Sequence, residues 1–213
     1  MKSLRVASGK WKGKEIPAPE EISGHQNFTN SLIKKAIFSL IDSKLAGWNL
    51  NLESALFCDY FSGSGQIAAE AYSLGYKRIL IYELDQERFS RLLKLFKGLE
   101  NIKLFRKDAT KHFLKWEPGT EQAQVFYLDP PYTYWSVTPV RMRKMLEELY
   151  AHCQTLSVPS VILCQIPEHQ KADSIWAEVP FKEREYGSHS LIETIVVPAS
   201  FANTLPSPAE NVE

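Results

Sequence analysis

Short runs rich in β-branched and aromatic residues alternate with longer amphipathic runs from about residue 55 onward. The short runs predict buried strands, and the runs between them have the spacing of helices. Strands that alternate with helices need crossover connections, which build a parallel sheet covered on both faces. The predicted strands are residues 55–60, 78–83, 102–107, 125–129 and 160–166, and the predicted helices are residues 66–74, 86–99, 110–116 and 140–153.

Two further strand-like runs, residues 181–186 and 191–197, are separated by only four residues. A connection this short permits only an antiparallel hairpin. The sequence therefore predicts an α/β fold with a mostly parallel sheet of seven strands that is closed at one edge by an antiparallel hairpin.

The regions outside this alternation predict a small extension at each end. Residues 4–8 and 11–16 flank Gly9-Lys10 and predict a basic hairpin, which a helix at about residues 31–45 follows. The last 14 residues contain two prolines and few apolar residues, which predicts a frayed tail. The predicted domains are residues 1–54 (hairpin and helix extension), 55–199 (the α/β domain) and 200–213 (a disordered tail).

The composition excludes several classes of protein. The 213 residues hold 25 basic and 25 acidic side chains and are 44% apolar, so the chain is neither collagenous nor disordered overall. No apolar run is long enough for a membrane helix, and no apolar segment follows the basic N-terminus as in a signal peptide. The three widely spaced cysteines form no disulfide or metal pattern. We therefore expect a cytoplasmic protein without membrane association and without a metal.

A glycine loop, Asp59-Tyr60-Phe61-Ser62-Gly63-Ser64-Gly65, joins the first predicted strand to the first predicted helix. Glycines there let the backbone approach a ligand beside the free N–H groups of the helix start. With Ala68 the loop also matches the looser dinucleotide fingerprint of nicotinamide-dependent oxidoreductases, and a tight turn without a ligand is the plain alternative.

Acidic residues at successive strand ends favour a different cofactor. Asp59 would face the pyrophosphate of a dinucleotide, and like charges repel. S-adenosylmethionine carries an amine and a sulfonium but no phosphate, so Asp59 favours it. Glu83 is placed to accept from its ribose hydroxyls, and Asp108 is placed to accept from its adenine amino group. The candidate cofactor-binding residues are Asp59, Phe61, Gly63, Gly65, Glu83, Leu84, Asp108 and Ala109.

The motif Asp129-Pro130-Pro131-Tyr132 follows the fourth predicted strand. The amine of an aromatic base is a poor nucleophile because its lone pair is delocalised into the ring. Asp129 and the Pro130 carbonyl can accept the two amine hydrogens, while Tyr132 stacks on the base and the prolines hold the backbone. An unpaired or flipped base could reach this site. These four residues are the catalytic candidates, although Asp-Pro-Pro can also be plain turn chemistry.

With these motifs the chain resembles the class I, Rossmann-like S-adenosylmethionine-dependent amino-methyltransferases. More narrowly, it resembles the bacterial small-subunit (16S) ribosomal RNA guanine-N2 methyltransferases. This resemblance rests on residues 5–14, the glycine loop, Asp129 to Tyr132, and Tyr186-Gly187. It implies methyl transfer to the exocyclic amine of a guanine, with S-adenosylmethionine as cofactor and with ribosomal RNA or the assembling small subunit as partner.

One segment departs from the family pattern. Where the family usually reads Arg-Pro-Thr-Thr-Asp-Arg-Val-Arg-Glu, residues 27–35 read Asn-Phe-Thr-Asn-Ser-Leu-Ile-Lys-Lys. Only Thr29 and the basic character at Lys34 persist. Three alternatives to the RNA methyltransferase therefore remain at this point: a DNA adenine-N6 methyltransferase, which shares the catalytic motif, a catalytically silent RNA-binding relative, and a nicotinamide-dependent oxidoreductase.

The charges sum to zero but cluster along the chain. The basic hairpin has no acidic residue before position 15, and a second basic group follows the catalytic motif. Trp11 among lysines can stack on a base while its neighbours contact phosphates. We expect a monomer that contacts RNA through a local basic edge, with Arg5, Lys10, Trp11, Lys12, Lys14, Arg141 and Arg143 as the RNA-binding candidates.

Overall fold

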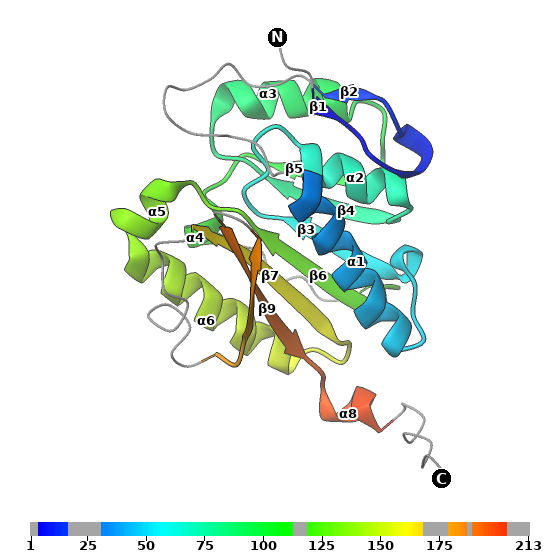
Figure 1. Cartoon of the computed structure of the whole chain (residues 1–213), viewed down its shortest axis with the longest axis vertical. Coiled ribbons are helices and arrows are strands. Elements are labelled where there is room, and N and C mark those ends of the chain that lie inside the picture. The colour runs from blue at the N-terminus through cyan, green and yellow to red at the C-terminus, as the bar shows by residue number, and fades with distance from the viewer. Residues whose placement is uncertain (1–3, 17–30, 113–118, 168–178, 187–188, 204–213) are drawn as a thin grey trace.

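The computed structural model describes residues 4–16, 31–112, 119–167, 179–186 and 189–203. Seven strands form one sheet in the order β5-β4-β3-β6-β7-β9-β8, and neighbouring strands are parallel except where β9 pairs with β7 and with β8 (Figure 1). The predicted fold class is therefore confirmed. The strands are β3 (Ala55–Asp59), β4 (Arg78–Tyr82), β5 (Ile102–Phe105), β6 (Ala123–Leu128), β7 (Ser160–Pro167), β8 (Lys182–Tyr186) and β9 (His189–Val196).

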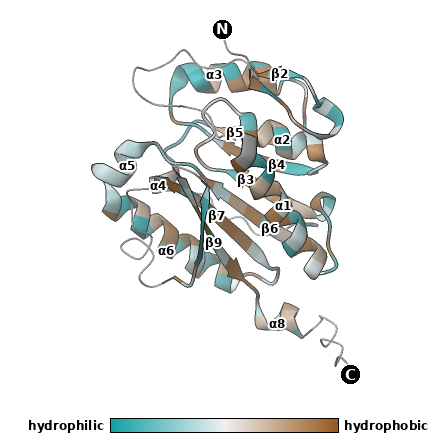
Figure 2. Cartoon of the chain, viewed as in Figure 1, coloured by the Kyte–Doolittle hydropathy of each residue, from teal (hydrophilic) through white to brown (hydrophobic). Residues whose placement is uncertain are grey.

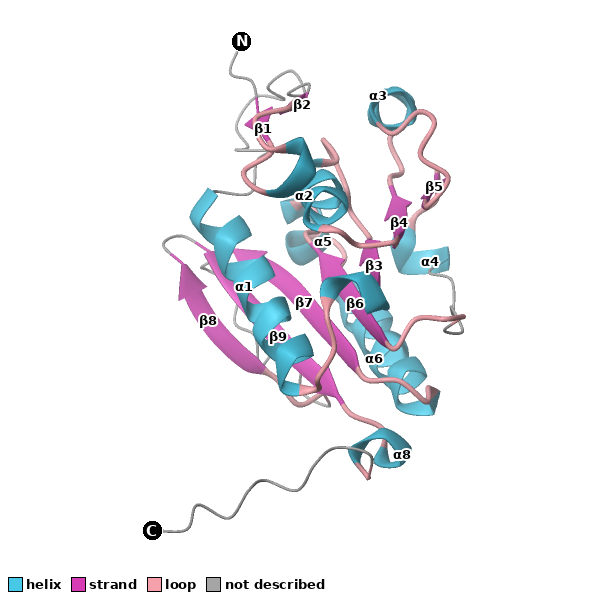
Figure 3. Ribbon diagram, turned by 90° about the vertical axis from the view of Figure 1, so that its right-hand side faces the viewer, coloured by secondary structure: helices cyan, strands magenta, loops and turns pink. Residues whose placement is uncertain are grey.

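Helices cover both faces of this sheet, as the alternation predicted. The apolar side chains of α1 (Ser31–Gly47), α2 (Gln66–Leu74) and α3 (Gln86–Leu95) join one core layer, and those of α6 (Pro139–Thr155) join the other. Figure 2 shows the apolar residues along the strands, and Figure 3 shows α1 lying across one face of the sheet. Two short helices, α4 (Ala109–His112) and α5 (Tyr132–Ser136), lie on the α6 side.

Alternation along the strands decides which side chains share a face. Phe57, Val125 and Leu163 belong to the core layer under α1 and α2, whereas Cys58 and Phe126 belong to the layer under α6. Asp59, Tyr127 and Gln165 each lie two positions after one of the residues in the α1 layer. Their side chains therefore also point toward the α1 face. This parity matters for the site described below.

The predicted N-terminal hairpin exists, but its strands are much shorter than expected. Only β1 (Leu4–Arg5) and β2 (Glu15–Ile16) pair, and a 3-10 turn, η1 (Gly9–Trp11), occupies much of the segment between them. In this segment the Ala7 and Trp11 amides donate to Glu70 and Ser73 of α2, while Val6 still pairs with Gly13 and Lys14 across the hairpin. A Cβ on Gly9 would lie 1.9 Å from the Ser73 carbonyl oxygen, so the backbones approach too closely for any other residue.

A buried group of polar side chains, which we call the α2 latch, holds the hairpin and α1 to α2. Glu70 Oε1 accepts hydrogen bonds from the Ala7 amide (2.7 Å) and from Lys34 Nζ (3.1 Å). Ser73 Oγ accepts from the Trp11 amide (2.7 Å) and donates to the Ser8 carbonyl. The side chains of Lys34 and Glu70 are 5% and 3% exposed. Every one of these buried groups therefore has a partner.

The C-terminal segment differs from the predicted frayed tail over its first residues. Residues Ala199–Ala202 form α8, and the Phe201 ring contacts Trp48 edge-on at 6.3 Å between centroids. This aromatic contact joins α8 to the residue that follows α1. Residues 204–213 lie outside the described residues. Among the helices that are described, none is long and apolar enough to cross a membrane.

Candidate active site

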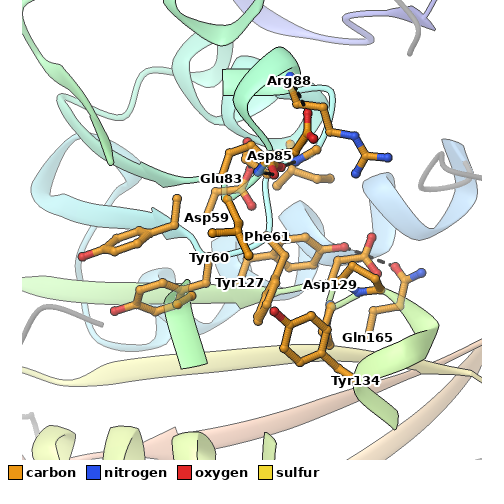
Figure 4. A pocket seen from close by; sticks show the side chains of 18 of the residues that line it. Asp59, Tyr60, Phe61, Glu83, Asp85, Arg88, Tyr127, Asp129, Tyr134 and Gln165 are labelled. Carbon is orange, nitrogen blue, oxygen red and sulfur yellow. Dashed lines mark hydrogen bonds between the residues drawn. The ribbon is translucent and has the colours of Figure 1, made fainter. Parts of the chain in front are cut away.

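A cavity of about 540 Å³ opens at the carboxyl ends of the parallel strands (Figure 4). Five adjacent strands each place one polar side chain in its wall. In sheet order from β5 to β7 these are Asp108, Glu83, Asp59, Asp129 and Gln165. Strand ends of a parallel sheet form a ligand site at the point where the connections diverge to opposite faces. The sequence predicted the four acidic members of this row and did not single out Gln165.

The glycine loop enters the cavity through Gly63, which has a φ of +56°. Gly65 has a different role from the one predicted. It is absent from the cavity wall, and a Cβ there would lie 2.5 Å from Leu92 Cδ2. With a φ of +79° it begins α2 and lets α3 pack closely against the loop. Gly65 therefore supports the conformation of the loop on the side that packs against α3.

Asp59 is the most buried carboxylate of the row. Asp59 is 1% exposed, and its Oδ2 accepts a hydrogen bond from Ser62 Oγ at 2.8 Å. Its Oδ1 has no partner among the described residues, and neither has the nearby buried Oε1 of Gln66. Burial raises the pKa of Asp59 to about 7, and repulsion from Asp129 and Glu83 adds to the rise while the Ser62 bond opposes it. Two buried acceptors thus lack a donor in the same wall.

Glu83 is held by the backbone. Its two carboxylate oxygens accept from the Gly63 amide and from the Asp85 amide, each at 2.8 Å. Burial raises the pKa of Glu83, and these two hydrogen bonds oppose the rise. Leu84 is 54% exposed and lies in the cavity wall. A carboxylate fixed in this way still has lone pairs for hydroxyl groups of a ligand.

Asp108 lies at the far end of the row and also caps α4. Its Oδ1 accepts from the Thr110 amide (3.0 Å) and from Thr110 Oγ1 (2.7 Å). Tyr134 of α5 lines the same cavity, and burial and the negative charge of Asp108 raise its pKa. The next residue, Ala109, is buried in the wall. Asp108 therefore combines the capping of α4 with a place in the cavity wall.

The catalytic candidates continue directly from β6. Asp129 and Pro130 follow its last residue, Pro131 is the N-cap of α5, and Tyr132 is the first residue of that helix. All four line the cavity. Burial and the neighbouring Asp129 charge raise the pKa of Tyr132, so its hydroxyl stays protonated. The short helix α5 was not predicted, because five residues are too few for a helical pattern to be recognised.

Among the residues of the cavity wall, the sequence interpretation missed Tyr127, Tyr134 and Gln165, whereas it did predict Phe61. Phe61 and Tyr134 meet edge-on with ring centroids 5.5 Å apart, so α5 packs against the glycine loop. Tyr127 and Gln165 are buried wall residues whose side chains are hydrogen-bonded at 3.2 Å. The signal that could have found Gln165 is an amide two residues before the end of an otherwise apolar strand.

Fewer side chains of the basic hairpin are available to contact RNA than its sequence suggested. Trp11 contacts Tyr72 at 4.6 Å and Phe96 at 6.2 Å between ring centroids, and Lys14 Nζ lies 3.2 Å from the centre of its ring. Trp11 is therefore used to dock the hairpin, which leaves its predicted stacking on a base without support. Lys10 Nζ lies over the Tyr72 ring, Arg5 pairs with Glu15 at 2.9 Å, and Lys12 is exposed.

The second basic group lies on the first two turns of α6. Arg143 Nε pairs with Glu147 at 2.8 Å, and Lys144 pairs with Glu148 at 3.7 Å. Arg141 is exposed beside the exposed side chains of Val137 and Val140. The RNA-binding candidates of both groups lie outside the cavity wall, and their role stays a prediction.

Residues 27–30 of the divergent segment lie outside the described residues. Lys34, the basic residue that persists there, is buried against Glu70 in the α2 latch. Its charge is thus used to hold α1 to α2. Within the described part of the chain, no group of three or more His, Cys, Asp or Glu side chains is placed to hold a metal ion.

A family model described as conserved hypothetical protein 95 matches residues 4–195. The chain is 26% identical over 138 residues to ribosomal RNA small subunit methyltransferase D of Haemophilus influenzae, covering 62% of this chain and 65% of the relative. It is 27% identical over 132 residues to YlbH of Bacillus subtilis, covering 61% and 67%. The chain thus spans about two thirds of the length of these curated relatives.

Solved structures share the fold at low identity. The Escherichia coli protein yhhF aligns with a TM-score of 0.66 at 16% identity, covering 91% of this chain and 98% of that one. An RNA methyltransferase from Salinibacter ruber, solved in complex with S-adenosyl-L-homocysteine, aligns with a TM-score of 0.53 at 13% identity, covering 87% and 99%. The fold is the Rossmann-like fold of the class I methyltransferases.

Proposed function

Because the chain belongs to the conserved hypothetical protein 95 family, whose model spans most of it, we propose that it is an S-adenosylmethionine-dependent RNA methyltransferase. It transfers a methyl group to the exocyclic amine of a base, and guanine N2 in 16S ribosomal RNA is the target that the family resemblance favours. The ribosomal RNA methyltransferase name of the Haemophilus influenzae relative supports an RNA substrate.

The observation that carries this proposal is the placement of Asp-Pro-Pro-Tyr in one cavity with two buried acceptors that lack a donor. Asp59 Oδ1 and Gln66 Oε1 are buried without a partner. Leaving buried acceptors unpaired is unfavourable, so such a wall favours a ligand that brings N–H donors and positive charge. The α-amino group of S-adenosylmethionine has both properties, whereas a pyrophosphate has neither.

The rest of the wall fits the cofactor as well. Glu83 is held by two backbone amides in a position to accept from ribose hydroxyls, and Gly63 leaves room for a ligand near the backbone. Asp108 and Ala109 line the same cavity, which supports our proposal that Asp108 accepts from the adenine amino group. When bound, S-adenosylmethionine supplies a sulfonium methyl group that an amine nitrogen can attack.

The protein's own contribution to the reaction lies in the motif after β6. Asp129 and the Pro130 carbonyl accept the hydrogens of the target amine and so hold its nitrogen with the lone pair free for attack. Pro130 and Pro131 restrict the backbone, so these acceptors are positioned before the base arrives. Tyr132 offers its ring to the base, and Asp129 or water takes the amine proton after attack. A histidine is not required.

The proposed function is tested by methyl transfer from labelled S-adenosylmethionine to naked 16S RNA, assembled small subunits and duplex DNA, followed by mass spectrometry of the modified nucleoside. We expect N2-methylguanosine in one of the RNA substrates. N6-methyladenine in the duplex would indicate the DNA enzyme instead. Failure to bind S-adenosylhomocysteine in calorimetry would refute the proposal at its first step.

A further inference from the structure

Gln165 lies in the cavity wall on the far side of Asp129 from the cofactor residues. In the parallel pairing of β6 with β7, Leu128 is opposite Cys164, so the next residues, Asp129 and Gln165, are lateral neighbours. Figure 4 shows their side chains close together. The proposed cofactor contacts Asp59, Glu83 and Asp108 all belong to β3, β4 and β5. Gln165 therefore lies on the side of the cavity that is left for the target base.

The Gln165 side chain points into the cavity from the α1 face of the sheet. It has the same parity on β7 as Leu163, which belongs to the core layer under α1. The residue is only 7% exposed, and yet it lines the cavity. A buried amide in this position is unfavourable unless its polar atoms find partners.

Tyr127 fixes the orientation of this amide. Its hydroxyl donates to Gln165 Oε1 at 3.2 Å, and its own ring is 1% exposed in the core layer under α1. Because Oε1 is engaged, the hydrogen-bonding groups that the amide presents to the cavity are the two N–H donors of Nε2. The wall thus presents an acceptor, Asp129, and beside it a donor, Gln165.

This order of groups matches the edge of an aminated base. In guanine, adenine and cytosine, the ring carbon that bears the amine also bears an unprotonated ring nitrogen. The edge therefore presents an N–H donor next to a nitrogen acceptor, which complements a carboxylate next to an amide N–H. We propose that Gln165 recognises the target base by donating to this ring nitrogen, which is N3 in guanine, and that Tyr127 is a positioning residue for Gln165.

This inference rests on the proposed function and names the residue on which the target base is held. It requires no new chemical step, because Gln165 binds and orients the base while Asp129 accepts from the amine. Deleting a hydrogen bond to the base should reduce methyl transfer and leave the cofactor site intact. A purely structural role of Gln165 would instead change stability and cofactor binding together.

The test compares Gln165→Leu, which keeps the size and removes the donor, with wild type in methyl transfer to in vitro transcribed 16S RNA or to small subunits. We expect kcat/KM for RNA to fall about 10- to 100-fold, because a polar partner on the base is left unpaired. The dissociation constant of S-adenosylhomocysteine should stay within about twofold, since that ligand does not reach β7.

Tyr127→Phe tests the positioning role, and Tyr76→Phe is its matched control. Both remove the hydroxyl of a buried tyrosine, and Tyr76 has no place in the cavity wall. We expect Tyr127→Phe to lower kcat/KM about 3- to 10-fold, because the Gln165 amide can then rotate. In the double variant with Gln165→Leu, the Tyr127→Phe change should add nothing further.

Gln165→Glu supplies a readout that a structural role would not produce. An ionised Glu has no donor and repels Asp129, but a protonated Glu regains an O–H donor. The activity of this variant relative to wild type should therefore rise as the pH falls from 8 to 6. A constant ratio across this range, or unchanged kcat/KM in Gln165→Leu, would overturn the inference while the proposed function stood. A wild-type protein that methylates none of the RNA substrates would overturn both.

Discussion

The two ends of α2 carry buried polar groups that are satisfied in opposite ways. At its last turns, the α2 latch pairs Glu70 with Lys34 and joins Ser73 to the hairpin backbone. At its first turn, Gln66 Oε1 and the neighbouring Asp59 Oδ1 have no described partner. The same helix therefore has one end where every buried group is paired and one end where acceptors accumulate.

The paired end of α2 has a structural role, and the end with unpaired acceptors has the character of a ligand site. A buried ion pair whose partners are both hydrogen-bonded holds elements together, and its polar groups need no ligand. A group of buried acceptors that lack donors is unfavourable in the folded protein and is retained where a ligand completes it. The pKa of Asp59 is raised to about 7 because its carboxylate is buried in this way. The following changes test the comparison from the largest expected effect to the smallest.

Asp129→Ala should give the largest effect. It removes the acceptor that holds the target amine, so we expect methyl transfer to RNA to fall on the order of 10³-fold. The pKa of Asp59 includes repulsion from Asp129, so the folded protein should lose no stability. Single-turnover kinetics measures the rate of methyl transfer, and thermal unfolding measures the stability. An active Asp129→Ala protein would remove this residue from the reaction.

Glu70→Ala should damage the other end of α2. It leaves the Lys34 ammonium buried without its partner and frees the Ala7 amide, so we expect the free energy of unfolding to fall by about 3–5 kcal/mol. Urea denaturation measures this change. Glu53→Ala is the control, because Glu53 and Lys77 form an exposed pair that should contribute nothing resolvable. Equal midpoints for the two variants would mean that the latch does not hold the hairpin.

Asp59→Asn should make stability less dependent on pH. The folded-state pKa of about 7 exceeds the ordinary value of 3.8, so the folded protein keeps a proton that the unfolded chain releases near pH 4. The contribution of Asp59 to stability is thus present at low pH and is lost as the pH rises from about 4 to 7. We expect Asp59→Asn to be more stable than wild type by about 2–4 kcal/mol at pH 8 and by little at pH 4.

The same carboxylate should make ligand binding depend on pH. Ionised Asp59 is the form that attracts the amine of S-adenosylhomocysteine, so the affinity of wild type should rise between pH 6 and pH 8. Calorimetry at both pH values measures it. Asp59→Asn should show a flat profile, and a parallel rise in both proteins would assign the pH dependence to another group.

Lys12→Ala should have the smallest effect. Lys12 is exposed on the hairpin, so we expect RNA affinity to fall about twofold to threefold and the salt dependence of binding to weaken by somewhat less than one unit of slope. Arg143→Ala is the matched comparison, since Glu147 already neutralises that guanidinium. If Arg143→Ala weakened binding more than Lys12→Ala, the RNA would contact α6 rather than the hairpin.

Much of the sheet could be predicted from the sequence because its signals are local. Buried strands read as apolar runs, and α2 was predicted with its observed bounds because Gly65 and Gly75 delimit it. Asp59, Glu83 and Asp129 were found because each directly ends or follows a strand. The family resemblance also proved correct.

What could not be predicted depends on contacts between distant segments. Trp11 and the lysines around it were interpreted as an RNA surface, but Tyr72 and Phe96 occupy the Trp11 ring, and no local pattern announces that packing. Gly65 was assigned to the cofactor because its role in packing against Leu92 is visible only in the fold. Gln165 was missed because its significance comes from the lateral register with Asp129.

The strand β9 lies between β7 and β8, and its eight residues pair with the whole length of β7. During synthesis, β7 is therefore completed well before its partner leaves the ribosome. Until residues 189–196 emerge, the apolar strand β7 has an open edge that could pair with another chain. A protein shortened before residue 189 would keep every proposed cofactor contact in its sequence and yet would be expected to aggregate. Among the described strands, β9 is the last to be synthesised, and its pairing with β7 removes this open edge.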